Sequence, residues 1–266
     1  MIKVATINLL FDMKFWDIRQ DLLVEGLKQT NADIVGLQEI NIAENTGDRI
    51  AEKLDMPYIY QTKCQQLPYK GGPEYGNAII SRYPFIQQEQ LDLQGQGRLA
   101  QYVQIEVNHQ PFIFCNGHYY WKPGSCQARM EQFKLLVDWL GELPPQLPII
   151  TVGDFNATPD TPEIDFLRDN FTSAYANYHN SEPEYTCPTP LVKITKKIHR
   201  KVGLRVMNLL VHGQAKAWQG TLDYIFINQH LQVNNCQLIL TDPATNNQYM
   251  YPSDHFGIAA EFAIKV

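Results

Sequence analysis

An acid and an amide stand close together in the stretch PIITVGDFNATPD, residues 148–160. Ile149 to Gly153 has the composition of a buried strand, and Asp154 and Asn156 follow at its end. Neither residue type favours strands, and a buried carboxylate is costly unless another group compensates it. Taken alone, the stretch is best interpreted as a turn, because Asp and Asn side chains stabilise turns by bonding to nearby backbone groups.

Other polar residues also stand where apolar runs end or begin. They are Asn8 in ATINLL, Gln38 and Glu39 in DIVGLQEIN, Asn116 and His118 in PFIFCNGHYYW, Asp223 in GTLDYIFIN, and Asp254 and His255 in YPSDHFGIAAEF. Each residue alone has an ordinary explanation, such as a strand-end cap, a surface charge or a satisfied buried histidine. Strand ends on one side of a sheet share one edge, so we expect these side chains to converge on one site.

The residue types favour phosphoryl transfer to water with the help of a metal. Carboxylates such as Glu39 and Asp254 and an Asn carbonyl suit Mg²⁺ or Mn²⁺, and no cluster has the Cys/His spacing of structural zinc. A carboxylate such as Asp154 can orient water, while a divalent metal and imidazolium donors neutralise phosphate oxygens. A histidine held by a buried aspartate, which fixes its tautomer and raises its pKa, can assist the leaving oxygen.

Strands must position these residues, and the sequence contains nine strand-like runs. They are Ile2–Ile7, Ile34–Leu37, Asn77–Ser81, Ala100–Val107, Pro111–Asn116, Ile149–Gly153, Leu222–Ile227, Val233–Leu240 and Phe256–Phe262. Strands outnumber helices and many connections are short. This pattern predicts two packed sheets with helices outside, in one domain.

Three segments have helical periodicity. In SCQARMEQFKLLVDWLG, one face carries Met130, Phe133, Val137 and Leu140, and we expect Ser125 to cap the start and Gly141 the end. In DIRQDLLVEGLKQT, Ile18, Leu22 and Leu27 are expected on one buried side. Thr46–Leu54 is a shorter and weaker candidate.

The composition bounds the class of protein. A hydrophobic share of 44% over 266 residues supports a large packed core, and a net charge of -6 argues against a nucleic-acid coat protein without excluding a local basic groove. The start MIKVATINLL lacks the features of a secretory signal, and no apolar run reaches the roughly 18 residues that cross a bilayer.

The cysteines favour a reducing compartment. Five are scattered along the chain, at Cys64, Cys115, Cys126, Cys187 and Cys236, and no CxxC occurs. An odd, scattered set suits reduced thiols better than disulfides or zinc, which predicts a cytoplasmic location, although a chain trimmed of a signal peptide would look the same.

Residues 188–218 differ from the rest and predict a basic amphipathic insertion. Six basic residues from Lys193 to Arg205 occur without an acid, and Ile194, Ile198, Val202, Val206 and Leu209 fall at helical spacing. A surface helix that packs its apolar stripe on the domain is the favoured interpretation. The alternative is a peripheral contact with an anionic surface, either as a lid over substrate or against lipid.

The motifs TIN, LQE, YGNAIISRYP, NGHYYW, GDFNATP, LDYIF and SDH follow one another along nearly the whole chain. In this order they resemble the endonuclease/exonuclease/phosphatase superfamily. The resemblance implies an α/β (α+β) fold, a four-layer sandwich of two packed mixed β-sheets flanked by helices.

The resemblance also implies roles for residues that match the motifs. They are metal binding for Asn8, Glu39 and Asp254, catalysis for His118, Asp154, Asn156, Asp223 and His255, and substrate contact for Asn77, Arg98 and Asn116. One departure is GHYYW, since many relatives have Thr or Ser before the histidine and a small apolar residue after it. The aromatic residues could be core, or a wall beside a base or an acyl chain.

The prediction for function is a Mg²⁺- or Mn²⁺-dependent hydrolase of phosphodiester or phosphomonoester bonds, a nuclease-type phosphodiesterase that acts as a monomer on nucleic acid. The alternative within the fold is a phospholipid or inositol-phosphate hydrolase of the sphingomyelinase or phosphatase kind. A different class is a binding module that has lost catalysis. Its mark would be a missing acid or histidine, and none is missing.

Overall fold

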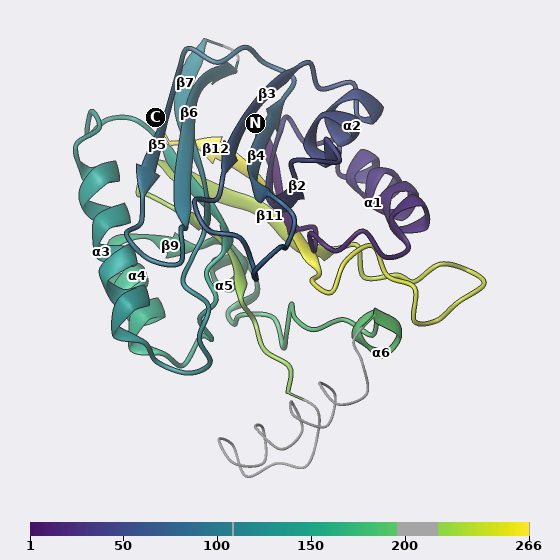
Figure 1. Ribbon diagram of the computed structural model, residues 1–266. Coiled ribbons are helices and arrows are strands. Elements are labelled where there is room, and N and C mark those ends of the chain that lie inside the picture. The colour runs from purple at the N-terminus through teal and green to yellow at the C-terminus, as the bar shows by residue number, and fades with distance from the viewer. Residues whose placement is uncertain (108, 196–217, 266) are drawn as a thin grey trace.

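The computed structural model describes residues 1–107, 109–195 and 218–265, and these form two six-stranded sheets that lie face to face (Figure 1). The order in the first sheet is β11 (Leu231–Ile239), β12 (Gly257–Ile264), β1 (Ile2–Asn8), β2 (Ile34–Asn41), β4 (Tyr75–Ser81) and β3 (Tyr58–Lys63). The order in the second is β5 (Gln87–Asp92), β6 (Leu99–Val107), β7 (Gln110–His118), β8 (Ile149–Asp154), β10 (Asp223–Ile227) and β9 (Thr172–Ser173).

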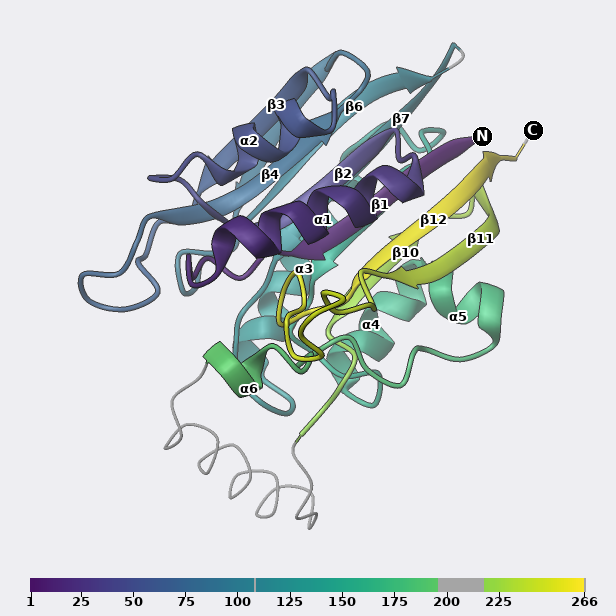
Figure 2. The same cartoon turned by 90° about the vertical axis from the view of Figure 1, so that its right-hand side faces the viewer.

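Helices cover the outer faces of both sheets, which makes the four layers of the sandwich (Figures 1 and 2). The first sheet is covered by α1 (Trp16–Thr30) and α2 (Thr46–Lys53), and the second by α3 (Gln127–Gly141) and α4 (Pro162–Asn170). Two short helices, α5 (Ala174–His179) and α6 (Val192–Thr195), follow. The predicted fold class is therefore confirmed. No helix in the described part of the chain combines the length and apolarity needed to cross a bilayer.

Three apolar clusters explain why the central strands are continuous apolar runs. One lies between the sheets and includes Ile34, Phe112 and Phe262, and the other two lie beneath the outer helices. Because a central strand of this sandwich is buried on both faces, apolar residues are favoured at every position instead of at alternate ones. The nine predicted strands are all present.

The predictions missed the edge strands β3, β5 and β9 and misplaced two helix features. The sequence QQEQLD of β5 has one apolar residue, because this edge strand is mostly exposed. In α1 the buried face runs through Trp16, Gln20, Leu23, Val24 and Leu27, while Ile18 is 49% exposed. Two polar residues on that face, Arg19 and Gln20, are buried, and the apolar pattern alone did not reveal this.

The expected caps of α3 were also wrong. Cys126 precedes the first turn without a side-chain hydrogen bond, so Ser125 is not the cap, and Gly141 is the last helical residue, before Glu142. Of the basic insertion at 188–218, α6 contains Lys193 and Ile194. Residues 196–217, which carry most of that predicted helix, lie outside the described part of the chain.

Each sheet contains one parallel strand pair, and these two pairs organise the molecule. β1 runs parallel to β2, with Asn8 opposite Gln38, and β7 runs parallel to β8, with His118 opposite Asp154. All other strand pairs within the described sheets are antiparallel. The carboxyl ends of β1, β2, β7 and β8 therefore meet the amino ends of the strands beside them at one edge.

Asn116 ties the two sheets together at this edge. Its Nδ2 donates to the carbonyl oxygens of Leu37 and Ala78, both at 3.0 Å, and its Oδ1 accepts from Nε2 of Gln38 at 2.6 Å. The side chain has no exposure, and its amide is fully used by these partners. Asn116 is thus placed between the sheets, and its expected contact with substrate stays a prediction.

A close approach of β7 and β8 places His118 beside Asp154, and it requires glycine. Gly153 has φ +139°, and a Cβ there would lie 1.9 Å from the carbonyl oxygen of Gly117. We expect Gly153→Ala to lower the free energy of unfolding by more than about 2 kcal/mol, from backbone strain and overpacking.

Chemical denaturation would measure this change. Gly141→Ala is the matched control, because nothing lies within 4 Å of the added methyl group. It should leave stability unchanged or raise it by up to about 1 kcal/mol. Equal effects of the two substitutions would contradict the assignment of strain to Gly153.

Candidate active site

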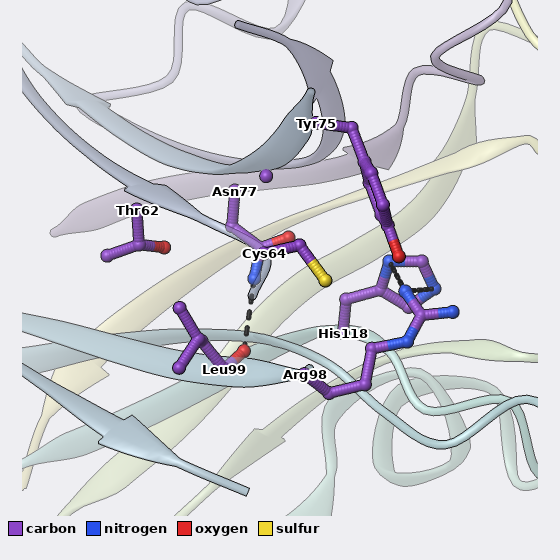
Figure 3. A pocket seen from close by; sticks show the side chains of 8 residues that line it. Thr62, Cys64, Tyr75, Asn77, Arg98, Leu99 and His118 are labelled. Atoms are coloured by element: carbon purple, nitrogen blue, oxygen red, sulfur yellow. Dashed lines mark hydrogen bonds between the residues drawn. The ribbon is translucent and has the colours of Figure 1, made fainter. Parts of the chain in front are cut away.

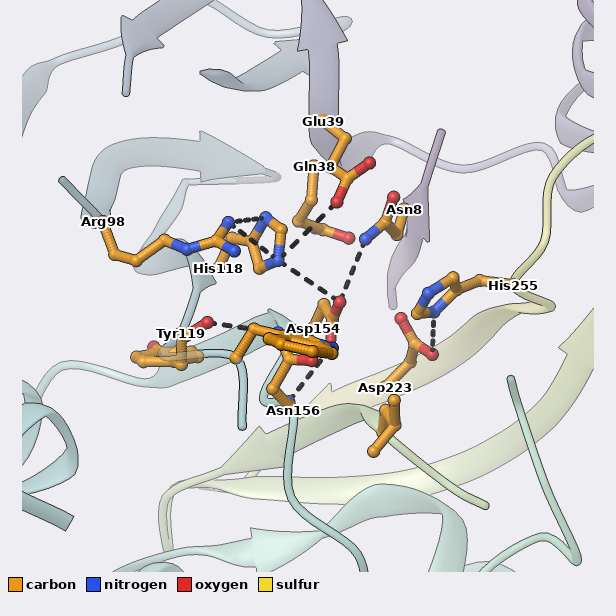
Figure 4. A network of polar contacts seen from close by, with 12 residues as sticks. Asn8, Gln38, Glu39, Arg98, His118, Tyr119, Asp154, Asn156, Asp223 and His255 are labelled. Atoms are coloured by element: carbon orange, nitrogen blue, oxygen red, sulfur yellow. Dashed lines mark hydrogen bonds and ion pairs between the residues drawn. The ribbon is translucent and has the colours of Figure 1, made fainter. Parts of the chain in front are cut away.

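Eight of the predicted site residues come together at the edge where the two parallel pairs end (Figure 4): Asn8, Glu39, Arg98, His118, Asp154, Asn156, Asp223 and His255. Asn8, Glu39, His118 and Asp154 belong to the strands that finish there, and Arg98, Asp223 and His255 precede or begin strands that start there. Glu39 sits at an irregularity in the pairing of β2 with β4 and has φ +56°. A bulge of this kind re-aims a side chain, which explains how Glu39 joins the group.

Asp154 lies at the centre of the cluster and is 2% exposed. Its Oδ2 accepts from Nδ2 of Asn8 at 3.0 Å, and its Oδ1 accepts from the backbone N–H of Asn156 at 3.0 Å. Burial raises the pKa of Asp154 to about 7, although the charge of His255 and these two hydrogen bonds act in the other direction. A carboxyl with such a pKa can take up a proton near neutral pH.

Asn156 follows in a left-handed conformation, φ +51°, which lets the chain turn sharply after β8. Its Nδ2 donates to the carbonyl oxygen of Tyr119 at 3.1 Å, so the amide orientation is fixed. The initial alternatives for this stretch, a turn or a site, are therefore both realised: the turn is what brings the acid and the amide to the shared edge.

Asp223 and His255 form a buried couple on the other side of Asp154. His255 Nδ1 donates to Asp223 Oδ2 at 2.9 Å, and Asp223 has no exposure. Burial lowers the pKa of His255, but the Asp223 carboxylate outweighs it and holds that pKa well above its usual range. The imidazole is thus kept protonated, as a donor to an anion requires.

Sequence reasoning missed Thr186, the third member of this group. Its hydroxyl donates to Asp223 Oδ2 at 2.6 Å and accepts from the backbone N–H groups of Leu222 and Asp223 at 2.9 and 3.2 Å. Because the backbone donors occupy its lone pairs, the hydroxyl proton must point at the carboxylate. A threonine in an irregular stretch carries no sequence signal for this contact.

His118 has a different electrostatic environment from His255. Burial lowers its pKa well below the usual range, and the charges of Arg98 and His255 lower it further. Its ring nitrogens lie 2.7 and 2.9 Å from Nη1 of Arg98, and Nε2 lies 3.4 Å from Oδ2 of Asp154. His118 is therefore neutral here and accepts a hydrogen bond from Arg98.

Glu39 and Asp254 provide the oxygen ligands expected for a hard cation. Oε2 of Glu39 accepts from the N–H of Phe11 at 3.2 Å, and Oε1 lies 4.0 Å from His118 Nε2. Burial raises the pKa of Glu39, and repulsion by Asp254 raises it further. Two acids that repel each other next to the Asn8 amide fit a divalent cation, which would relieve the repulsion.

A second group could also hold a metal. Asp154, Asp223 and His255 offer ligand atoms that all lie within 4.8 Å of one another. In this group Asp223 Oδ2 already accepts two hydrogen bonds, and both oxygens of Asp154 accept one. The Glu39–Asp254 pair is the better candidate because its two carboxylates repel each other, and repulsion by Asp254 adds to burial in raising the pKa of Glu39.

Arg98 differs from the other buried arginines in its lack of oxygen partners. Arg19 and Arg129 are fully buried, and each donates to several backbone carbonyls, with Glu163 added for Arg129. Arg98 is 9% exposed, and among the described residues its only hydrogen-bond partner is the neutral His118 ring, with Nε unpaired. A buried cation without oxygen partners is costly, so this position favours an incoming anion.

A small cavity lies beside Arg98 and His118 (Figure 3). Thr62, Cys64, Tyr75, Asn77 and Leu99 also line it. Asn77 Nδ2 donates to the carbonyl oxygen of Leu99 at 3.1 Å, and the guanidinium of Arg98 lies 5.8 Å from the Tyr75 ring centre. Asn77 thus borders the cavity, with its amide N–H engaged by the backbone.

Two mixed sheets with acids, amides and histidines enclosed at one edge define an α/β sandwich with a buried polar site. The chain belongs to the Endonuclease/Exonuclease/phosphatase family, whose profile matches residues 5–255, and the predicted family is confirmed.

Among curated proteins, Nocturnin of Drosophila melanogaster is 24% identical over 290 residues, and 2',5'-phosphodiesterase 12 of Bos taurus is 23% identical over 286 residues. Each alignment covers 94% of this chain but only 42% and 46% of those proteins, so the chain spans less than half of their length.

Solved structures share the fold. The human Nocturnin catalytic domain with bound sulfate superposes with a TM-score of 0.76 at 21% identity, covering 99% of this chain and 94% of that chain. D. rerio TDP2 with a single-strand DNA product also gives 0.76, at 16% identity and 98% coverage of both chains.

The unusual environment of Arg98 leads to a prediction about anions. We expect inorganic phosphate to raise the unfolding temperature of the wild type in the presence of a chelator, because the anion binds the folded state alone. Arg98→Met should abolish this shift. Without phosphate it should cost less than about 1 kcal/mol of stability, because a costly buried charge is removed.

Thermal unfolding over a phosphate series would measure both effects. Arg168→Met is the control, since Arg168 pairs with Asp165 and Glu182 at the surface. That variant should keep the wild-type response. A full phosphate shift in Arg98→Met would show that the anion binds elsewhere.

Proposed function

We propose that this protein is a Mg²⁺-dependent nuclease-type phosphodiesterase. One observation carries the proposal: the carboxyl of Asp154, with a pKa of about 7, lies in one cluster with the Asn8 amide, His118 and the charge of the protonated His255. Water needs a base to attack a phosphate, and the phosphate oxygens need positive charge. Both requirements are met within one cluster.

In this proposal Asn8, Glu39 and Asp254 would hold Mg²⁺ or Mn²⁺. When bound, such a cation would neutralise charge on the phosphate oxygens. Asp154 orients the attacking water and accepts its proton, and Asn156 and Asn8 hold that carboxylate in place through their hydrogen bonds.

His255, kept protonated by Asp223, donates to a phosphate oxygen and stabilises the developing charge. Arg98 supplies a second positive group, and the neutral His118 orients it. Asn77 stays a proposed substrate contact because it borders the cavity beside Arg98.

Nucleic acid is the substrate class that the relatives favour. The names of the relatives include a 2',5'-phosphodiesterase and a 3'-5'-exoribonuclease subunit, and one related structure contains a single-strand DNA product. We carry this class over to the present chain as a proposal. An activity panel in Mg²⁺ with single- and double-stranded DNA, RNA, sphingomyelin and inositol phosphates tests it. Hydrolysis of the lipid or inositol substrates alone would overturn it.

We further propose that residues 1–266 act as one monomeric domain in the cytoplasm. All five cysteines are buried and free, which supports a reducing compartment. The anionic-surface contact through Lys193–Arg205 stays a prediction, because only Lys193–Thr195 of that stretch lie in the described part of the chain.

The proposed cation site predicts metal dependence. Hydrolysis should require Mg²⁺ or Mn²⁺, stop in excess chelator, and be weak with Ca²⁺, which tolerates irregular geometry. Glu39→Gln removes a charged ligand and should raise the Mg²⁺ concentration for half-maximal activity by at least about tenfold.

A metal titration of the hydrolysis rate would measure this change. Glu52→Gln, an exposed acid on α2, is the control and should titrate like the wild type. Full activity of the wild type in chelator would refute the proposed cation site.

The group Thr186–Asp223–His255 predicts coupled effects on kcat. Asp223→Asn should lower kcat by on the order of 10²–10⁴, as the loss of an orienting Asp does in a catalytic triad. Thr186→Val should lower kcat about tenfold with little change in KM, while Thr186→Ser, which keeps the hydroxyl, should retain activity.

Steady-state kinetics of the single and double variants would test the coupling. The double variant Asp223→Asn, Thr186→Val should be no slower than Asp223→Asn alone, because Thr186 acts through that carboxylate. Effects that multiply would show that Thr186 does not orient Asp223.

A further inference from the structure

Trp121 exposes a large aromatic ring in the loop that joins β7 to α3. The residue is 59% exposed, although a tryptophan usually buries most of its surface. It stands three residues after His118, and three residues of chain span at most about 10 Å. The backbone of Trp121 therefore lies in the immediate surroundings of the proposed site.

The backbone of Trp121 is held on both sides by one glutamine. Its N–H donates to Oε1 of Gln96 at 2.8 Å, and its carbonyl accepts from Nε2 of the same side chain at 3.0 Å. Gln96 precedes Arg98 by two residues, and Arg98 contacts His118. The loops before β6 and after β7 are thus joined directly beside the Arg98–His118 pair.

A second set of contacts holds the rest of this loop. Gln132 accepts from the N–H of Tyr120 at 2.7 Å and donates to the carbonyl of Gly95 at 3.2 Å. Arg129, fully buried, donates to the carbonyls of Lys122 at 2.8 Å and of Gly124.

Glu163 completes this support. It pairs with Arg129 at 3.2 Å and accepts from the N–H of Cys126. Burial of an ion pair is costly, and here it fixes the shape of an exposed loop. The ring of Trp121 is thus presented on a rigid backbone.

We propose that Trp121 is a stacking platform for the nucleobase next to the phosphate that Arg98 receives. This inference rests on the proposed nuclease function and extends it to the substrate: a single-stranded segment or end, because the base faces of a duplex are covered by neighbouring bases. Stacking on an aromatic ring holds a base without reading its identity. The contact therefore predicts affinity for single strands with little sequence preference.

The surroundings of the ring favour a base over a membrane. Lys122, Pro123, Gly124 and Ser125, which follow Trp121, are all exposed, and none has a large apolar side chain that could enter lipid beside the indole. The strength of membrane binding scales with the apolar area that is inserted, and a single ring provides only a small area. A single ring suffices for one base, and the Lys122 charge suits the phosphate backbone of a nucleic acid.

The test is binding of a fluorescent single-stranded hexanucleotide, followed by anisotropy in excess chelator so that no hydrolysis is needed. Trp121→Ala should weaken binding between about 5-fold and 100-fold, the range for loss of one stacked base. Trp121→Phe should retain most of the affinity. Tyr178→Ala, which removes an exposed ring on α5, is the matched control and should bind like the wild type.

Hexanucleotides with one abasic position locate the stacked base. At one position, removal of the base should weaken binding to the wild type as much as Trp121→Ala weakens binding of the intact strand. Removal of that base should leave the affinity of Trp121→Ala unchanged. Binding of Trp121→Ala within twofold of the wild type, or no binding of the wild type, would overturn the platform.

Sedimentation with phosphatidylcholine–phosphatidylserine vesicles separates the lipid alternative. If Trp121→Ala abolishes binding to the vesicles and leaves the affinity for the hexanucleotide unchanged, Trp121 is a membrane contact. That outcome would overturn the proposal. The binding assay needs no turnover, so it tests the stacking contact separately from the proposed activity. If the protein binds the strand through the base but hydrolyses no phosphodiester, the proposed activity is refuted and the stacking proposal still holds.

Discussion

The hydrogen bond from Asn8 to Asp154 joins the ends of two strands that belong to different sheets. It can form only if both sheets finish at the same edge and face each other closely enough for side chains to meet. The parallel pairs β1–β2 and β7–β8 satisfy this condition, because each delivers two carboxyl ends to that edge. Asn116, held by carbonyls of the facing sheet, fixes the separation. The position of every proposed catalytic group depends on this alignment.

Charge placement follows a consistent rule in this protein. Buried charges with a structural role have their polar partners within the chain. Arg19 donates to several backbone carbonyl oxygens, and Arg129 forms an ion pair with Glu163. The environment around Asp154 differs, since repulsion by Asp254 adds to burial in raising the pKa of Glu39, and Arg98 donates to a neutral imidazole. Such groups lower the stability of the free protein, and the ligands that restore balance are a cation and an anion.

Much of the fold and site was predictable from the sequence, for physical reasons that differ between residues. Asp154 and Asn8 stand out because polar residues interrupt buried apolar runs at strand ends. The edge strand β5 was missed because exposure removes the apolar pattern on which strand prediction depends.

Ile18 was misplaced because the buried face of α1 includes polar residues that contact loops distant in sequence, such as Arg19, which donates to the carbonyl of Pro252. Thr186 had no signal for a related reason: its role comes from a partner 37 residues away. Tertiary contacts of this kind leave no local trace, and the pKa of His118 is likewise lowered by burial and by the nearby Arg98.

The position of β12 beside β1 has a consequence for how the protein becomes active. The first strand pairs with β12, and Ser253 donates to the carbonyl of Asn8 at 2.6 Å across 245 residues. Contacts between such distant segments form late, because the entropy of closing the loop opposes them. A nascent chain on the ribosome therefore lacks His255 and the strand that anchors it until β12 has been made. Before that point the Asp223–His255 couple cannot form, and the proposed site is incomplete.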